Sequence, residues 1–154
     1  MYNSYLKKQS MKVADSFVIK IINLIISKNF FNQLFKYSVV GIFNTIIGLT
    51  VIYFCFNILS FNYIFANIIG YACGLVNSFI WNKKWTFKST KHYSTEIIPF
   101  LTVFGVSYLT NLLAVIISVE LIGIHPNISQ ILGIVAYSST NFLINRYWTF
   151  SETN

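Results

Sequence analysis

The chain has 154 residues, of which 55% are hydrophobic and 10% charged, and its formal net charge is +7. Because a soluble domain usually carries about 25% charged residues, this composition argues against a soluble all-α protein. The basic balance would favour nucleic acid as a partner of a soluble protein, but the cations here follow a membrane topology, so we expect no nucleic-acid binding.

The first predicted element lies in a basic N-terminal segment, residues 1–34. From Lys12 to Ser27, polar residues recur every three or four positions, and apolar residues fill much of the other side. This spacing predicts an amphipathic helix over 12–27 that lies in the membrane interface. Such a helix would either anchor the chain and set its topology or recruit a partner enzyme. No A-x-A-like site follows it, so we expect no cleaved secretory signal.

Apolar segments follow along the rest of the chain. No Asp, Glu, Lys or Arg occurs from Tyr37 to Asn82, and a helix needs about 20 residues to cross the hydrocarbon core. We predict an all-α, polytopic membrane protein whose four transmembrane helices are, in order, residues 35–58, 63–81, 97–121 and 128–145. Short outer turns make each half an antiparallel helical hairpin.

The cations indicate how these helices are oriented. All eleven Lys and Arg residues precede the first span, lie between the second and third, or close the fourth. By the positive-inside rule, the N and C termini and the central loop are cytoplasmic. We therefore expect a multi-pass protein of the cell inner (cytoplasmic) membrane.

A six-residue phrase occurs near the end of each half. Asn82-Lys83-Lys84-Trp85-Thr86-Phe87 and Asn145-Arg146-Tyr147-Trp148-Thr149-Phe150 share their polar, cationic and aromatic order at a shift of 63 residues. We call these segments the repeated phrase. They predict two parallel repeats, residues 35–87 and 97–150, related by a pseudo-twofold axis along the membrane normal, with a tail at 151–154. Gly41 pairs with Gly105 only at a shift of 64, which predicts one inserted residue.

Polar side chains inside the spans are the first candidates for a substrate site. An asparagine amide in a span is costly unless it is hydrogen-bonded. These amides either bond one helix to another or together line a polar crevice between the two hairpins. The asparagines inside the predicted spans are Asn44, Asn67, Asn77, Asn111 and Asn141.

The repeated phrase is the second candidate. Two such helix ends side by side on the cytoplasmic face would form a cationic, amide-rich rim suited to a lipid with a phosphate and a polar head group. Arg146 can bind a phosphate through two parallel hydrogen bonds, whereas Lys83 and Lys84 would act as point charges. The aromatic residues predicted to lie at the membrane interface are Trp85, Phe87, Trp148 and Phe150.

Carboxylates are few, and they lie before the first span, at span ends or in the tail. Asp15 precedes the first span, and Glu96 and Glu120 lie at span ends. We therefore predict no buried carboxylate that could act as a general base, a metal ligand or a proton-coupling group. Accordingly, we expect no enzyme, no catalytic residue, no metal and no cofactor. The same lack disfavours a proton-coupled drug exporter, another class of four-helix protein.

From residue 35 to residue 150 the chain resembles the GtrA-like family of small four-helix membrane proteins. The resemblance is carried by residues 35–45, 77–87 and 145–150. It implies a flippase that moves polyprenyl-phosphate-linked sugar, such as undecaprenyl phosphate glucose, to the outer leaflet. A separate membrane glycosyltransferase would then decorate a cell-surface or cell-wall polysaccharide. The alternative function is a non-transporting scaffold for such a glycosyltransferase.

The resemblance and the polar pattern together give a set of predicted substrate contacts. Many relatives carry a second cation where this chain has Tyr147, which favours Lys83 and Lys84 over Arg146 for the phosphate. The expected partners are the lipid-linked sugar, membrane lipid and glycosyltransferases, and the small size favours a homodimer. The predicted substrate-binding residues are Asn44, Asn77, Asn82, Lys83, Lys84, Asn111, Asn141, Asn145 and Arg146.

Overall fold

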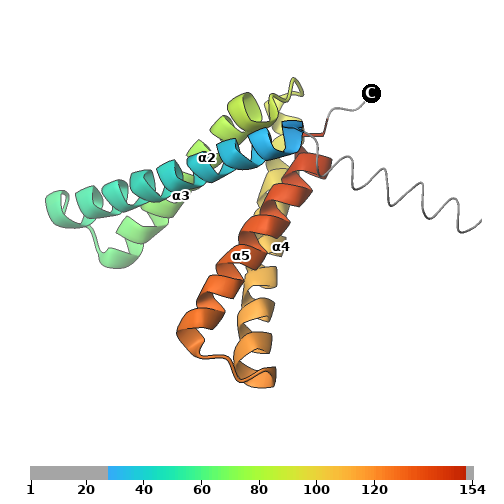
Figure 1. Cartoon of the computed structure of the whole chain (residues 1–154). Helices are drawn as coiled ribbons and strands as arrows, with labels where there is room; N and C mark the ends of the chain where they lie inside the picture. Colours follow the sequence, from blue (N-terminus) through green and yellow to red (C-terminus); the bar gives the residue numbers. More distant parts are fainter. Residues whose placement is uncertain (1–27, 152–154) are drawn as a thin grey trace, which may run out of the picture.

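The computed structural model describes residues 28–151 as four helices, each continued by a short π-helical segment (Figure 1). The elements are α2 (Lys28–Tyr53) with η1 (Phe54–Ile58), α3 (Tyr63–Trp81) with η2 (Asn82–Phe87), α4 (Tyr93–Ile116) with η3 (Ile117–Leu121), and α5 (Pro126–Ile144) with η4 (Asn145–Thr149). The predicted all-α fold is confirmed. The interfacial helix predicted at 12–27 lies outside the described residues.

The helices form two hairpins that meet at one end. The first hairpin comprises α2 and α3 with their π-helical segments, and the second comprises α4 and α5 with theirs. In Figure 1 the hairpins diverge from a shared end, where α2 begins and α5 finishes, and their tips lie far apart. We call this shared end the junction.

Two helices begin earlier than their apolar segments. The helix that holds the first span already includes Lys28, the first described residue, and the third starts at Tyr93 rather than at residue 97. Hydropathy locates the stretch that crosses the lipid, whereas the helix itself starts where its backbone is capped. At α4 this cap is His92, whose Nδ1 accepts a hydrogen bond from the backbone N–H of Ser94.

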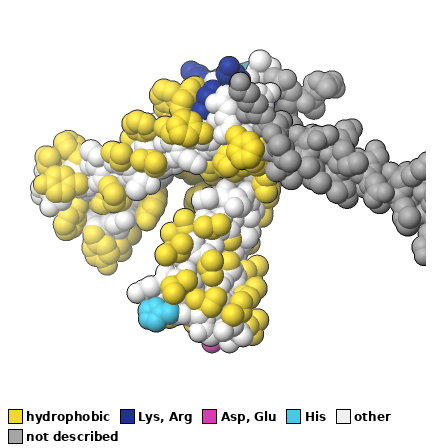
Figure 2. All heavy atoms as spheres, viewed as in Figure 1, with side chains coloured by type: hydrophobic (Ala, Val, Ile, Leu, Met, Phe, Trp, Pro, Cys, Tyr) yellow, Lys and Arg dark blue, Asp and Glu magenta, His cyan; other side chains and the backbone are white. Residues whose placement is uncertain are grey.

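The surface of the hairpins is that of a membrane protein. Within the described residues, three segments are long and apolar enough to cross a membrane: Asn29–Ile58, Tyr63–Phe87 and Tyr93–Leu121. The last helix is more polar because it carries the run 138–141, Ser-Ser-Thr-Asn. Figure 2 shows apolar side chains along both hairpins and Lys and Arg side chains at the junction. The positive-inside rule favours the cytoplasm for the junction.

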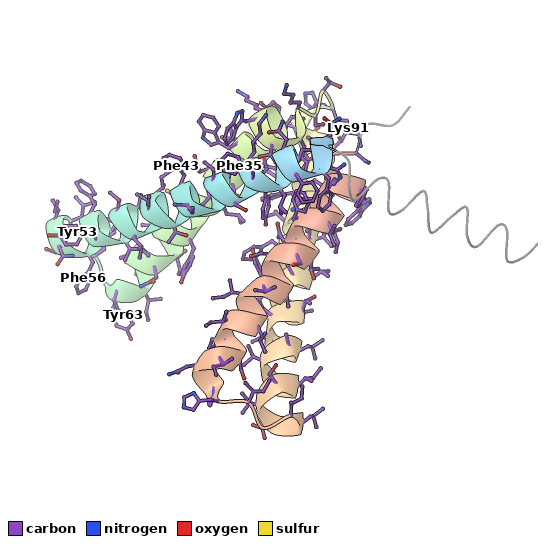
Figure 3. All side chains as sticks on the ribbon, in the orientation of Figure 1. Phe35, Phe43, Tyr53, Phe56, Tyr63 and Lys91 are labelled. Carbon is purple, nitrogen blue, oxygen red and sulfur yellow. The ribbon has the colours of Figure 1, made fainter. Side chains whose placement is uncertain are left out.

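Large apolar side chains point outward along the first hairpin (Figure 3). Phe43, Tyr53, Phe56 and Tyr63 are all exposed, whereas Lys91 lies at the opposite, junction end. In water, an apolar surface of this extent would mark an interface, and in a bilayer it is the face that acyl chains solvate. The exposed face therefore identifies where lipid lies around the hairpin.

The buried core lies at the junction and is aromatic. It consists of Phe79, Phe87, Phe100, Phe142 and Phe150. Phe87 and Phe150 stack on each other with ring centroids 5.2 Å apart and an interplanar angle of 17°. Both were predicted to lie at the membrane interface, but they are 7% and 3% exposed. They are buried because each packs the end of its own hairpin against the other hairpin. The prediction that Phe87 and Phe150 lie at the membrane interface is therefore wrong.

The aromatic contacts obey the pseudo-twofold relation at a shift of 63 residues. The Phe79–Phe150 centroid distance is 6.0 Å and the Phe87–Phe142 distance is 5.9 Å. These two pairs exchange when each residue is replaced by its counterpart in the other repeat. The Phe87–Phe150 stack maps onto itself, so the pseudo-axis passes through it.

The same shift holds inside the spans. Each repeat contains a buried glycine at which the neighbouring helix comes close, and the neighbours also differ by 63 positions. The matched contacts are Gly70 with Gly48 and Ile52, and Gly133 with Asn111 and Val115. The predicted inserted residue is therefore wrong. At the shift of 63 that these contacts follow, Gly41 is matched by Phe104 and Gly105 by Ile42.

Gly70→Ala should destabilise the first hairpin. A Cβ at this position would lie 2.4 Å from Ile52 Cγ1 and 2.8 Å from the backbone oxygen of Gly48. Because the backbone cannot move aside freely, we expect a loss of about 1–3 kcal/mol in the free energy of unfolding. Gly41→Ala is the matched control and should be neutral or slightly stabilising, since alanine favours helix. Equal thermal unfolding of the two variants in detergent would contradict the close packing.

Candidate functional site

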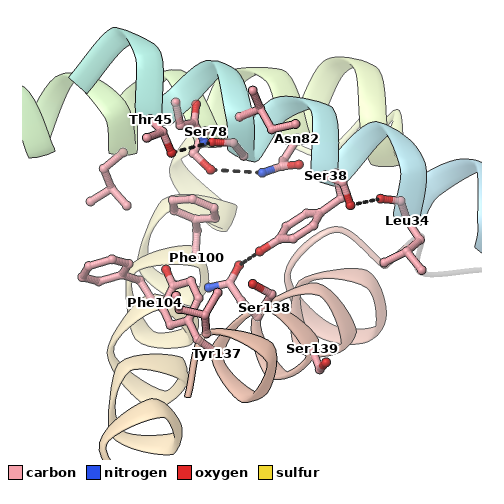
Figure 4. A pocket seen from close by; sticks show the side chains of 17 residues that line it. Leu34, Ser38, Thr45, Ser78, Asn82, Phe100, Phe104, Tyr137, Ser138 and Ser139 are labelled. Atoms are coloured by element: carbon pink, nitrogen blue, oxygen red, sulfur yellow. Dashed lines mark hydrogen bonds between the residues drawn. The ribbon is translucent and has the colours of Figure 1, made fainter. Parts of the chain in front are cut away.

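A polar crevice lies between the two hairpins beside the junction (Figure 4). Its volume is about 590 Å³, which falls within the range of about 300–1,000 Å³ typical of small-molecule sites. Aromatic rings form part of its wall, among them Phe100, Phe104 and Tyr137. The amide and hydroxyl side chains that line it are Ser38, Asn44, Thr45, Ser78, Asn82, Ser138, Ser139 and Asn141.

On one side of the crevice a hydrogen-bond network joins the hairpins. The Tyr37 hydroxyl donates to Asn141 Oδ1 over 2.9 Å, and Asn145 Nδ2 donates to the same oxygen over 2.8 Å. Tyr37 belongs to α2, whereas Asn141 and Asn145 lie at the end of the second hairpin. Asn141 therefore presents its amide in the crevice while it holds two neighbours in position.

On the other side, the crevice-lining amides Asn44 and Asn82 are held by hydrogen bonds within the first hairpin. Asn77 Nδ2 donates to Asn44 Oδ1 over 2.6 Å, which bonds α3 to α2. Asn82 Nδ2 donates to Ser78 Oγ over 3.1 Å. Asn77 faces a separate apolar groove on the first hairpin, next to Val39, so it serves helix packing rather than the crevice. Both interpretations of the span amides, interhelical bonding and crevice lining, thus apply to different members of the set.

The repeated phrase holds polar oxygens that are buried and unbonded within residues 28–151. They are Asn82 Oδ1 and Thr86 Oγ1 in one repeat, and Asn145 Oδ1 and Thr149 Oγ1 in the other. Buried polar atoms normally have a partner, which can be an ordered water or a ligand hydroxyl. The two repeats thus place the same unfilled hydrogen-bonding capacity at equivalent positions.

Lys83 forms a buried ion pair with a carboxylate from the other hairpin. Lys83 Nζ lies 2.5 Å from Glu96 Oε2, and the two side chains are 4% and 1% exposed. Ser89 Oγ donates to the second carboxylate oxygen, and Lys83 Nζ also donates to the backbone oxygen of Lys91 over 2.5 Å. The prediction that the spans bury no carboxylate is therefore wrong. Glu96 enters the structure in the first turn of α4, which begins before the apolar segment.

Arg146 occupies the position in the second repeat that Lys83 occupies in the first. Its guanidinium donates to Oε1 of Gln33, which is the counterpart of Glu96. The Lys83 ammonium lies 4.9 Å from the centroid of Tyr93, and the Arg146 guanidinium lies 5.2 Å from that of Phe30. Each cation thus bridges the hairpins through a polar partner and an aromatic ring.

A known protein family matches nearly the whole of the part of the chain that forms the two hairpins. Residues 36–150 match the family described as GtrA/DPMS, transmembrane domain. The chain belongs to this family. The family match covers both hairpins and both copies of the repeated phrase.

Curated relatives of this GtrA/DPMS domain come from several bacteria. It is 31% identical to the membrane protein YngA of Bacillus subtilis (strain 168) over 120 residues, which are 77% of this chain and 79% of that protein. It is 24% identical to the cell wall teichoic acid glycosylation protein GtcA of Listeria monocytogenes over 123 residues, with 77% and 85% coverage. It is 28% identical to the bactoprenol-linked glucose translocase of Shigella flexneri over 121 residues, with 79% and 98% coverage.

The remaining predicted contacts of this GtrA/DPMS domain lie away from the crevice. Lys84 is exposed at the junction, and Asn111 packs against Gly133 within the second hairpin. Trp148 is 52% exposed, as an interfacial residue would be. Trp85 is half-buried with the Lys36 ammonium 5.4 Å from its ring centroid. Sequence reasoning missed Gln33, Glu96 and Tyr37, although applying the shift of 63 to the whole chain would have paired the first two.

Proposed function

We propose that this protein translocates polyprenyl-phosphate-linked sugar across the cytoplasmic membrane, so that a membrane glycosyltransferase can use it on the outer side. The observation that carries the proposal is the crevice, which is polar inside and bounded by hairpins whose outer faces are apolar. A sugar head group would occupy the crevice, and the polyprenyl tail would remain in lipid between the diverging hairpins.

The chemistry of the lining suits a sugar. Moving a hydroxyl group from water into an apolar environment without a compensating hydrogen bond costs about 2–7 kcal/mol, depending on the reference scale. Amide side chains both donate and accept hydrogen bonds, as sugar hydroxyls do. Asn44, Asn82 and Asn141 line the crevice, and the Oδ1 of Asn82 has no partner within the described residues. These three amides are the proposed sugar contacts, with Asn145 behind them as a positioning residue.

Family relatives support the same function. One relative carries the name of a translocase for bactoprenol-linked glucose, and another that of a teichoic acid glycosylation protein. Together with membership of the GtrA/DPMS family, these names favour transport of a lipid-linked sugar over catalysis. Within the proposed mechanism, Asn77, Asn111 and Lys83 keep the helices packed rather than touch the sugar.

Asn82→Leu should slow translocation about tenfold, because one hydrogen bond of about 1–1.5 kcal/mol is lost as the sugar passes. The measurement uses purified protein in liposomes, with a short-chain polyprenyl-phosphate sugar and periodate to follow its exposure on the outside. Asn67→Leu is the matched control, since the Asn67 amide bonds to Tyr63 of its own helix over 2.8 Å. This control variant should transport normally.

The same assay tests the proposal as a whole. Wild-type protein should accelerate flipping of at least one sugar class over protein-free liposomes. If folded protein accelerates none of several sugars, transport is refuted, and the scaffold function becomes the one to test. Crosslinking to a membrane glycosyltransferase would then be the decisive measurement.

A further inference from the structure

The polar partners of the two buried or partly buried cations differ in charge between the repeats. In the first repeat Lys83 meets the carboxylate of Glu96, whereas in the second Arg146 meets the neutral amide of Gln33. Two features of the surroundings correspond: each cation follows a buried asparagine, and each lies over an aromatic ring of the other hairpin. The pseudo-twofold relation therefore sets a charged partner in one repeat against a neutral partner in the other.

The site around Lys83 is already filled. Its ammonium is buried, its charge is balanced by Glu96, and it also donates to the backbone oxygen of Lys91. Ser89 occupies the other oxygen of the carboxylate. An incoming anion would have to displace Glu96, which only accepts hydrogen bonds and would repel it. The first repeat thus holds a structural ion pair.

Within the described residues, no carboxylate balances the charge of Arg146, and most of its N–H donors are not used. Among residues 28–151, Lys83–Glu96 is the ion pair that the structure contains, and no carboxylate pairs with Arg146. A guanidinium has five N–H donors, and the Arg146–Gln33 hydrogen bond uses one of them. Gln33 also carries an amide NH₂ that can donate to an anion, as a carboxylate at that position could not. Both side chains are partly accessible.

We propose that Arg146 and Gln33 bind the phosphate of the lipid-linked sugar. The proposal rests on the proposed function and makes it more specific. Both residues neighbour the crevice along the chain: Asn145, next to Arg146, bonds to crevice-lining Asn141, and Gln33 precedes crevice-lining Leu34. A guanidinium binds phosphate oxygens through two parallel hydrogen bonds. This assignment reverses the preference for Lys83 and Lys84 drawn from the sequence.

Gln33→Glu tests the assignment with a conservative change. It gives Arg146 the carboxylate partner that Lys83 already has. The variant should therefore fold, and its unfolding temperature should be close to that of the wild type. Its affinity for a short-chain polyprenyl phosphate should fall at least about tenfold, since one charge-assisted hydrogen bond is lost and a repulsive charge is gained. Binding is measured on the full chain in detergent by native mass spectrometry.

Lys84→Gln is the charge-matched control, because it also lowers the net charge by one and removes an exposed cation at the junction. Its affinity should stay within about twofold of wild type, as expected for a surface charge. A wild-type affinity of Gln33→Glu, or a loss confined to Lys84→Gln, would overturn the proposal.

Two further arms identify the ligand. Polyprenol has the tail without the phosphate, so it should bind to the wild-type protein about tenfold more weakly than polyprenyl phosphate does. Its affinity should be the same for wild type and for Gln33→Glu. Glucose 1-phosphate in water should compete with the lipid if the site accepts phosphate from either source. If Gln33→Glu fails to fold, Arg146→Lys replaces it, since it keeps the charge but loses the two parallel hydrogen bonds and should bind about tenfold more weakly.

Measuring both binding and translocation distinguishes the proposed phosphate site from the proposed transport function. Loss of phosphate binding in Gln33→Glu, together with no flipping by the wild type, would support the anion site and refute the transport function. Unchanged binding and flipping in Gln33→Glu would refute the site and leave transport standing.

Discussion

Glu96→Ala should destabilise this protein by about 3–5 kcal/mol, because it leaves the Lys83 ammonium buried without a counter-charge. Both side chains are almost fully buried, so water cannot replace the lost partner without a rearrangement of the junction. The ion pair also bridges the two hairpins, and its loss should loosen the contact between them. Thermal unfolding in detergent, followed by circular dichroism, would give the shift.

A double variant separates the cost of an unpaired charge from the value of the pair itself. Lys83→Met with Glu96→Leu removes both charges and retains the apolar volume. Such replacements of buried ion pairs are often neutral or stabilising, so the double variant should recover most of the loss. If Glu96→Ala unfolded at the wild-type temperature, the junction would be open to water and the buried pair would contribute nothing to stability.

Ser138→Trp should reduce sugar translocation at least about tenfold while the fold is retained. Ser138 lies on the wall of the crevice and has no hydrogen bond recorded within the described residues, so its loss alone should be tolerated. The indole would fill space that the sugar head group needs, and exclusion worth about 1.4 kcal/mol already gives a tenfold effect. Initial flipping rates in liposomes, normalised to the amount of folded protein, measure the outcome.

Ile131→Trp is the matched control for this blockade. Ile131 lies on α5 like Ser138, but its side chain is 61% exposed and does not line the crevice. A tryptophan there should point into lipid and leave transport unchanged. Equal rates in the two variants would show that the head group passes elsewhere, whereas equal losses would indicate damage to the helix rather than to the crevice.

The helices and the repeat could be predicted because they depend on local patterns. Charge-free runs located the spans, and the order of the repeated phrase revealed the parallel hairpins. Glu96 was missed because its burial depends on Lys83, a partner across a loop, and a charged residue beside an apolar run gives no sign of its pairing. Phe87 and Phe150 were misplaced because an aromatic residue at a helix end has the same composition signal whether it faces lipid or another hairpin.

The candidate site was predictable in kind but not in arrangement. Amides in spans indicate a polar surface, and Asn44, Asn82 and Asn141 do line the crevice. Asn77 and Asn111 carry the same chemistry but turn to neighbouring helices instead. Which way a helix faces depends on packing between hairpins, and a hydropathy pattern that is apolar on all sides does not encode that rotation.

The stacked rings of Phe87 and Phe150 are placed where a pivot between the two hairpins would lie. Each hairpin has its own internal packing at Gly70 or Gly133, and the stack lies where the pseudo-axis crosses the junction. If one hairpin tilted about that point, a small change at the rings would become a large displacement at the distant tip (Figure 1). A head group could be admitted or released through such tilting without any helix having to unwind.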